Sequence, residues 1–161
     1  MKMHTEFTIR RACTRDASQV AAMVGELLSE IMASTGIQAF NFDLAATTER
    51  LADFISREKY FVFVACGEND GPVGFITLIE SYALYAEGAF GTIPELYVRP
   101  GFRSQELGRR LVRQARDFGS TRGWSRLEVT TPPLPQFDRT LLFYEREGFS
   151  ITGGRKLKAP L

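Results

Sequence analysis

The sequence predicts one mixed α/β domain over residues 1–161, and three observations support this fold class. Runs rich in β-branched and aromatic residues alternate along the chain with segments whose apolar residues recur at helical spacing. The length, 161 residues, is close to the common size of a single domain and is sufficient to bury a sizeable core. No linker, internal repeat or low-complexity tract divides the chain, so a second domain is not expected.

The first half is expected to hold a strand, two helices and a hairpin. The first helix is predicted from apolar residues such as Val20, Val24 and Leu27, which recur at helical spacing. The hairpin is predicted from two β-rich runs around an Asp-Gly turn. In chain order we expect a strand over Glu6–Arg11, a helix capped by Thr14 or Asp16 and reaching Ile31, a loop over Ala33–Phe42, a helix over about Leu44–Arg57, and strands over Tyr60–Cys66 and Pro72–Glu80.

The second half is expected to alternate strands and helices. Pro100 cannot donate to a strand ladder, so the strand before it should end there, and Gly123 and Gly148 are natural helix ends. We expect a strand over Ile93–Val98, a helix over about Gln105–Arg122, a strand over Arg126–Thr131, a short helix over about Asp138–Glu147 and a final strand over Phe149–Thr152. On the long helix, Leu107, Leu111, Ala115 and Phe118 share one face, and Arg109, Arg110, Arg113 and Arg116 lie mostly on the other.

Composition excludes several classes of protein. The formal net charge is +1, which gives no overall attraction to nucleic acid. No stretch approaches the roughly 18 apolar residues of a membrane helix, and the first ten residues lack the apolar core of a secretory signal. Cys13 and Cys66 are far apart and suit neither a disulfide framework nor a zinc site. We therefore expect a cytoplasmic protein with no membrane, nucleic-acid or metal partner. Assembly as a homodimer is left open.

Motifs for several common chemistries are missing from the sequence. The single histidine, His4, lies at the N-terminus, so a Ser-His-Asp or Cys-His site would have to use it. The chain contains no P-loop, no G-x-G-x-x-G, no HExxH and no paired CxxC. Dinucleotide-dependent hydride transfer, P-loop nucleotide hydrolysis and zinc chemistry thus lack their usual residues.

The segment from Pro94 to Gly108 is the strongest candidate for a binding site. A strand ends there, a basic turn follows, and a helix begins with its first N–H groups directed at the turn. Free N–H groups and the positive end of the helix dipole can bind a pyrophosphate, and Arg103 and Arg109 add charge. The alternative is an ordinary strand-to-helix turn whose arginines are simply solvated.

This segment resembles the acetyl-CoA motif of the GNAT superfamily, Arg/Gln-x-x-Gly-x-Gly/Ala, with Arg103 at the first position and Gly108 at the last. The L-x-V of Leu96 and Val98, the Arg-Pro pair and the downstream F-Y-E-R-E-G-F are also typical of the family. The resemblance runs from about Phe7 to Thr152. It implies a largely antiparallel mixed sheet of six to seven strands with about four helices. It also implies transfer of an acetyl group from acetyl-CoA to a primary amine of a small molecule or peptide.

The same resemblance implies which residues contact the cofactor. They are Leu96, Tyr97 and Val98 on the strand, whose backbone would hold the oxyanion, and Arg103, Ser104, Gln105, Glu106, Leu107, Gly108 and Arg109 at the turn. Glu106 replaces the middle glycine of the motif and puts a carboxylate near the expected pyrophosphate, which would weaken binding of CoA. Alternatively, Glu106 sits in the first helical turn, where acidic residues are favoured.

Two catalytic residues are predicted from the family pattern. Glu95, in the strand before the turn, is the candidate base for the amine, with Glu80 as a rival. By strand alternation Glu95 should share a face with Ile93 and Tyr97, and Leu96 and Val98 should face the other way. Tyr144 occupies the tyrosine position of the F-Y-E-x-x-G-F phrase and is the candidate acid for the CoA thiolate. Core packing is the alternative role for Tyr144.

Two further functions remain as alternatives. A CoA-binding regulatory module without catalysis would explain Glu106 and also Phe137, which stands where the family often has asparagine. A nucleic-acid partner would use the arginines of the Gln105–Arg122 helix, but the near-neutral total charge argues against it.

Overall fold

The computed structural model describes residues 6–161 and divides the chain into two units. The first unit ends at Thr130, and the second runs from Thr131 to Leu161. His4 lies outside the described residues. The N-terminal unit carries the sheet and the turn predicted to bind the cofactor, so it is described first.

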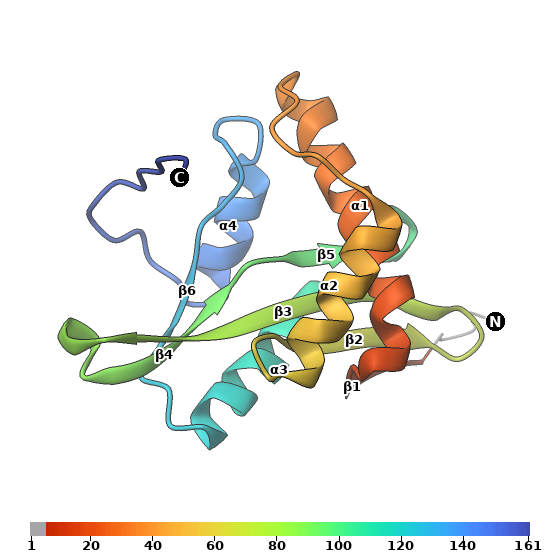
Figure 1. The fold of residues 1–161 in the computed structure, drawn as a ribbon, viewed down its shortest axis with the longest axis horizontal. Coiled ribbons are helices and arrows are strands. Elements are labelled where there is room, and N and C mark those ends of the chain that lie inside the picture. The colour runs from red at the N-terminus through yellow and green to blue at the C-terminus, as the bar shows by residue number, and fades with distance from the viewer. Residues whose placement is uncertain (1–5) are drawn as a thin grey trace. The chain divides into compact units, whose positions relative to one another are not determined.

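A six-stranded sheet is the framework of the N-terminal unit (Figure 1). Its order is β1-β2-β3-β4-β6, and β5 pairs with β3. All pairs are antiparallel except β4 with β6. The predicted mixed, mostly antiparallel sheet is therefore confirmed. The strands are β1 (Phe7–Arg11), β2 (Phe61–Gly67), β3 (Gly71–Ala83), β4 (Gly88–Ile93), β5 (Leu96–Val98) and β6 (Leu127–Val129).

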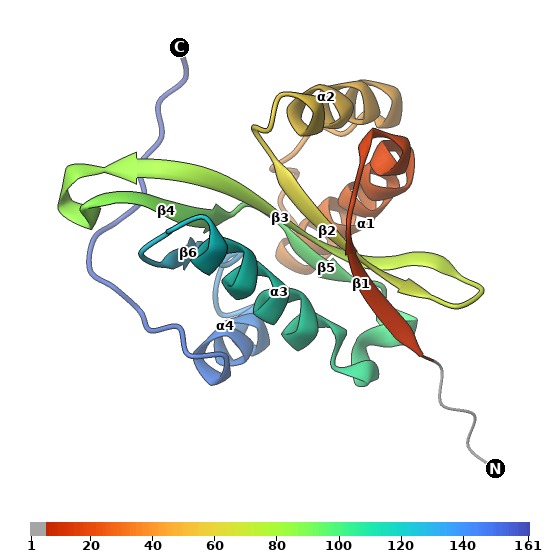
Figure 2. The ribbon, with the colours of Figure 1, turned by 90° about the horizontal axis from the view of Figure 1, so that it is seen from below.

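Helices cover both faces of this sheet. Figure 2 shows α1 (Ala17–Thr35) and α2 (Leu44–Ser56) on one face and α3 (Leu107–Thr121) on the other. Three 3-10 turns connect the elements: η1 (Thr14–Asp16), η2 (Leu84–Ala86) and η3 (Pro100–Gln105). Within residues 6–161, no helix has both the length and the apolar character needed to cross a membrane.

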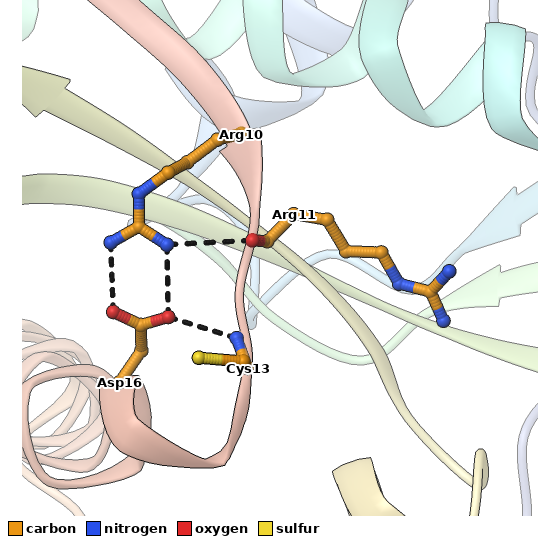
Figure 3. A network of polar contacts seen from close by, with 4 residues as sticks. All are labelled: Arg10, Arg11, Cys13 and Asp16. Atoms are coloured by element: carbon orange, nitrogen blue, oxygen red, sulfur yellow. Dashed lines mark hydrogen bonds and ion pairs between the residues drawn. The ribbon is translucent and has the colours of Figure 1, made fainter.

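The start of α1 is held by a polar network around Asp16 (Figure 3). Asp16 is the N-cap of α1, but its carboxylate turns back toward the preceding strand. It accepts hydrogen bonds from Arg10 Nη1 at 2.9 Å, Arg10 Nη2 at 2.8 Å and the Cys13 N–H at 2.8 Å. These donors favour the charged form and hold the pKa of Asp16 well below its usual range. The network ties the N-terminus of α1 to the end of β1.

The two faces of the sheet bury different cores. On the α1 and α2 face, Val64, Phe75 and Tyr97 pack with residues of α1 such as Val20 and Met23. The α3 face is aromatic, with ring centroids 4.9 Å apart for Phe61 and Phe118 and 5.5 Å apart for Phe118 and Trp124. An added Cβ at Gly91 or Gly119 would lie 2.4 Å or 2.8 Å from the Trp124 ring, so both positions require glycine. The predicted packing of Trp124 at the end of the long helix is confirmed.

Several predicted boundaries need correction. β3 extends to Ala83 and returns directly into β4, because residues 80–83 pair with residues 88–91 in a longer hairpin than the sequence suggested. The predicted strand over Arg126–Thr131 is reduced to Leu127–Val129, the residues that pair with β4. The predicted final strand over Phe149–Thr152 is wrong: its residues alternate, but the described chain provides no strand that pairs with them.

The C-terminal unit contains α4 (Asp138–Arg146), as the sequence predicted. The helix ends at Gly148, which has a φ of 92° and accommodates the left-handed turn that ends many helices. Tyr144, on α4, packs edge-on against Phe143 and Phe149, with ring centroids 5.2 Å and 5.3 Å away.

Candidate active site

A β-bulge interrupts the strand that was predicted over Ile93–Val98. Thr92 of β4 lies opposite Ile79 of β3, so regular pairing would bring Glu95 opposite Ile76. Leu96 occupies that position instead, which means that one extra residue lies between β4 and β5. Proline at position 94 suits such a break because it has no N–H to donate.

The bulge decides which side chains share a face. Because side chains alternate along a strand, one extra residue moves those that follow it to the opposite face. Glu95 and Tyr97 therefore face α1 and α2, whereas Ile93 faces α3. The predicted pairing of Glu95 with Tyr97 is confirmed, but the prediction that Ile93 shares their face is wrong.

The edge of β5 is open on the side away from β3. β4 and β6 pair in parallel up to Ile93 and Val129, and within the described chain β5 pairs with β3 alone. Bonds from the Thr77 N–H to the Glu95 carbonyl (3.0 Å) and from the Arg99 N–H to the Val73 carbonyl (2.9 Å) show that odd-numbered residues of this segment face β3. The N–H groups of Leu96 and Val98 consequently point to the open edge.

Glu95 is half-buried beside two hydroxyl groups. Thr77 Oγ1 donates a hydrogen bond to Glu95 Oε2, and Tyr60 donates to Oε1 at 3.3 Å. The Glu95 N–H donates in turn to Thr77 Oγ1 at 3.0 Å. Burial raises the pKa of the Glu95 carboxyl, and the two hydroxyl donors oppose that rise.

Glu80, the rival base, lies on the opposite face of the sheet. Its Oε1 accepts hydrogen bonds from the Trp124 indole at 2.6 Å and from Arg122 Nε at 3.2 Å, and Tyr82 donates to its other oxygen. The Trp124, Tyr82 and Arg122 donors lower the pKa of Glu80 to about 2. A carboxylate with such a low pKa is a poor acceptor for a proton at neutral pH.

The turn before α3 has an unexpected backbone. Glu106 is the N-cap of α3 with φ 58° and ψ 23°, the left-handed conformation that favours glycine. The helix therefore begins at Leu107, and the interpretation of Glu106 as a first-turn helical residue is wrong. Its side chain is 73% exposed and lies 3.8 Å from Arg109, so solvent and a cation both screen its charge.

Arg103 is already paired in this turn. Its Nη1 lies 2.8 Å from Glu30 on α1, its Nε donates to the Val98 carbonyl at 2.8 Å, and its guanidinium lies over the Tyr97 ring. The side chain thereby connects the turn to α1 and occupies the Val98 carbonyl, one of the two carbonyls of β5 that face the open edge. Ser104 and Gln105 are exposed in η3, Leu107 is buried and Gly108 is half-buried.

Within the C-terminal unit, the phenol of Tyr144 is buried. The Tyr144 side chain is 5% exposed, and burial raises its pKa well above the usual value. The phenol therefore stays protonated at neutral pH, which is the form an acid must have.

Sequence reasoning missed Tyr60, Thr77 and Glu30. Thr77 could have been singled out, because it is a polar residue in an otherwise apolar stretch of strand. Nothing in the sequence indicated that its partner is Glu95, 18 positions away. Tyr60 and Glu30 contact residues 35 and 73 positions away, which no local pattern indicates. Among residues 6–161 there is no group of three or more His, Cys, Asp or Glu side chains that could hold a metal ion.

Comparisons with known proteins agree with this geometry. Residues 58–151 match the Acetyltransferase (GNAT) domain family. Aminoalkylphosphonate N-acetyltransferase of Salmonella typhimurium is 31% identical over 151 residues, 94% of this chain and 90% of that protein. Streptothricin acetyltransferase of Streptomyces lavendulae is 36% identical over 93 residues, 56% of this chain but only 45% of that protein. The structure of an aminoglycoside acetyltransferase from an uncultured soil metagenomic sample shares the fold, with a TM-score of 0.75, 20% identity and coverage of 96% of each chain.

The matched family model gives the class of protein, an acetyltransferase of the GNAT fold. The matched family and the relative aligned along nearly its full length make the assignment specific: the chain belongs to the GNAT acetyltransferase family. It is an N-acetyltransferase, an enzyme that transfers an acetyl group to an amine.

Proposed function

We propose that the chain transfers an acetyl group from acetyl-CoA directly to a primary amine of a small molecule. The observation that carries this proposal is the bulge, which sets a half-buried carboxylate beside the open edge of β5. Relatives named for streptothricin and for aminoalkylphosphonates support a small amine as the acceptor. A peptide amine is the alternative acceptor.

The residues present suit the proposed cofactor. The first N–H of α3 bonded within the helix belongs to Arg110, which donates to the Glu106 carbonyl at 3.2 Å. The N–H groups of Leu107, Gly108 and Arg109 precede it and lie at the positive end of the helix dipole, where anionic phosphates bind. The N–H groups of Leu96 and Val98 would bind the rest of the acetyl-CoA molecule, beyond its phosphates, along β5. Acetyl-CoA, when bound, supplies the thioester that the amine attacks.

Glu95 is proposed as the base that takes a proton from the amine. A primary amine of the lysine type has a pKa near ~10.4, so at neutral pH most of it is protonated and cannot attack. A carboxylate whose pKa is raised by burial accepts a proton more readily than one at the ordinary value. Glu80 is disfavoured as base because its pKa of about 2 and its place on the α3 face both oppose the role.

Tyr144 is proposed as the acid that protonates the departing thiolate of CoA. Its raised pKa keeps the phenol protonated until a strong base is formed nearby. This role rests on the family pattern and on the protonation state of the phenol.

Two measurements test the proposal. Release of CoA should be followed with acetyl-CoA and a panel of amines that includes aminoalkylphosphonates, aminoglycosides, streptothricin, polyamines and short peptides. In parallel, acetyl-CoA should raise the melting temperature by mass action. Turnover with a small amine is expected. Tight binding of acetyl-CoA without turnover of any amine would instead select the non-catalytic CoA-binding module, and the absence of binding would rule out both functions.

A further inference from the structure

Two hydroxyl groups donate hydrogen bonds to the Glu95 carboxylate, one to each oxygen. Tyr60, in the loop before β2, donates to Oε1 at 3.3 Å, and Thr77, on β3, donates to Oε2. The inference drawn from them rests on the proposed role of Glu95 as base.

Thr77 is placed to fix both the backbone and the side chain of Glu95. Its hydroxyl oxygen accepts the Glu95 N–H at 3.0 Å, while its single hydroxyl hydrogen goes to the carboxylate. Thr77 is only 1% exposed, so water does not compete for either bond. One hydroxyl therefore ties the bulge and the carboxylate together.

Tyr60 is placed by α2. Its ring packs on Phe54 of that helix with centroids 5.1 Å apart, and its N–H donates to the Phe54 carbonyl at 3.2 Å. Burial and the neighbouring carboxylate raise the pKa of the phenol well above its usual range, so Tyr60 remains a donor at any pH used for assay.

The other titratable groups near this face are engaged elsewhere. Tyr97, on the same face of β5, donates its hydroxyl to Glu26 of α1 at 3.2 Å. Glu26 also pairs with Arg99 at 3.0 Å. In the described part of the chain, Tyr60 is thus the titratable side chain that contacts the Glu95 carboxylate, and its partner Thr77 is uncharged.

We propose that Tyr60 and Thr77 are positioning residues that hold the Glu95 carboxylate in one orientation by donating a hydrogen bond to each oxygen. Burial disfavours the ionised carboxylate, and the two donors favour it. Without them the half-buried side chain would be neutral over more of the working pH range and free to rotate away from the amine. Since each bond is to a charged group, loss of one should raise the pKa of Glu95 further.

The test uses the full chain and a readout that does not require turnover. Side-chain carboxyl carbons of glutamate are labelled with ¹³C and titrated by NMR, and Glu95→Gln assigns the resonance. Tyr60→Phe should move the midpoint of Glu95 upward, and Thr77→Val by at least as much. Thr77→Ser keeps the hydroxyl and should restore the midpoint. Tyr85→Phe removes a hydroxyl from a tyrosine that is 77% exposed and should leave it unchanged.

A second arm measures single-turnover rates against pH with 2-aminoethylphosphonate, an aminoalkylphosphonate, and saturating acetyl-CoA. Tyr60→Phe should shift the acidic limb of this profile upward by the same amount as the NMR midpoint, and acetyl-CoA should still raise the melting temperature of the variant by as much as that of the unmodified protein. An NMR midpoint that is the same in Tyr60→Phe, Thr77→Val and the unmodified protein would overturn the positioning role. Shifted midpoints in a protein that turns over no amine would retain it and remove the proposed function instead.

Discussion

Glu80 and Glu95 lie in the same sheet, yet their surroundings push their pKa values in opposite directions. Glu80, on the α3 face, is hydrogen-bonded by Trp124 and Arg122, and its pKa falls to about 2. Glu95, on the α1 and α2 face, has neutral hydroxyl partners and is more deeply buried, so its pKa rises. A cation and an indole therefore stabilise one carboxylate, whereas desolvation destabilises the other.

The difference suits Glu80 to a structural role and Glu95 to the base role proposed for it. The charged form of Glu80 is stabilised in the folded protein by its hydrogen-bond donors. Through Arg122, Glu80 also joins β3 to the end of α3. Glu95 is kept in a place where its charge costs stability, which is common for groups that must exchange protons. Both residues are glutamates near strand ends, so only their partners distinguish them.

Glu95→Gln should produce the largest effect on activity. Without a base, the single-turnover rate should fall by about 100-fold or more. Stability should not fall with it: because the folded-state pKa of Glu95 is raised, the charged form destabilises the fold above that pKa, and a neutral glutamine removes this cost. Urea unfolding at neutral pH should therefore show equal or greater stability. An unchanged single-turnover rate would show that water, not Glu95, takes the proton.

Tyr144→Phe should also lower the single-turnover rate, by about 100-fold, because the proton for the thiolate is lost. Affinity for acetyl-CoA should remain nearly the same, since the ring and its packing on Phe143 and Phe149 are retained. Rapid-quench measurements are needed because slow product release would mask the change in steady state. A mutant as fast as the parent would mean that Tyr144 serves only in packing.

Glu80→Gln should reverse the pattern seen at Glu95. Turnover should stay within about threefold, and the free energy of unfolding at neutral pH should fall by about 1 kcal/mol through weakened charge-assisted bonds to Arg122 and Trp124. Glu80 has a lowered folded-state pKa, so its contribution is present above the unfolded value of 4.5 and is lost as pH falls toward 2. Denaturation curves of both proteins should accordingly converge over that range. A large loss of activity with intact stability would reinstate Glu80 as the base.

Glu106→Gly should have the smallest effects. Glycine adopts the left-handed backbone of this position without strain, so stability should rise by about 1 kcal/mol. Removing the negative charge should tighten CoA binding by about fivefold, and this gain should shrink as salt is raised.

Glu87→Gly is the matched control, because Glu87 also has a left-handed backbone, with φ 59°, but belongs to the turn between β3 and β4. It should gain similar stability with no change in the calorimetric affinity for CoA. If both variants bind CoA as the parent does, the Glu106 carboxylate does not oppose the cofactor.

The sequence predicted most of the elements because their signals are local. Apolar spacing located α1, α2 and α3, and the Asp-Gly turn located the hairpin of β2 and β3. The bulge was not predictable: Pro94 indicates a break, but only the register with β3 shows on which side of it the alternation changes. The contrast between the surroundings of Glu80 and Glu95 was likewise hidden in the sequence, because it depends on residues distant along the chain: Trp124, Arg122, Tyr60 and Thr77.

The backbone of Glu106 shows a different limit. Its neighbours resemble the start of an ordinary helix, in which an acidic residue is favoured, and the family motif alone hinted that glycine belongs there. The structure gives Glu106 the left-handed conformation that favours glycine, which matches the expectation of glycine at this position of the motif.

The bulge also governs how this protein should be aligned with distant relatives. Residues before Pro94 follow the register of β4 with β3. Residues after it follow the register of β5 with β3, which continues to Arg99 and the turn beyond it. A one-residue gap placed on the wrong side would equate Glu95 with a residue on the other face and report the proposed base as lost. Equivalents of Glu95 should therefore be located by counting backward from the arginine-proline turn, which in this chain lies on the same side of the bulge as Glu95.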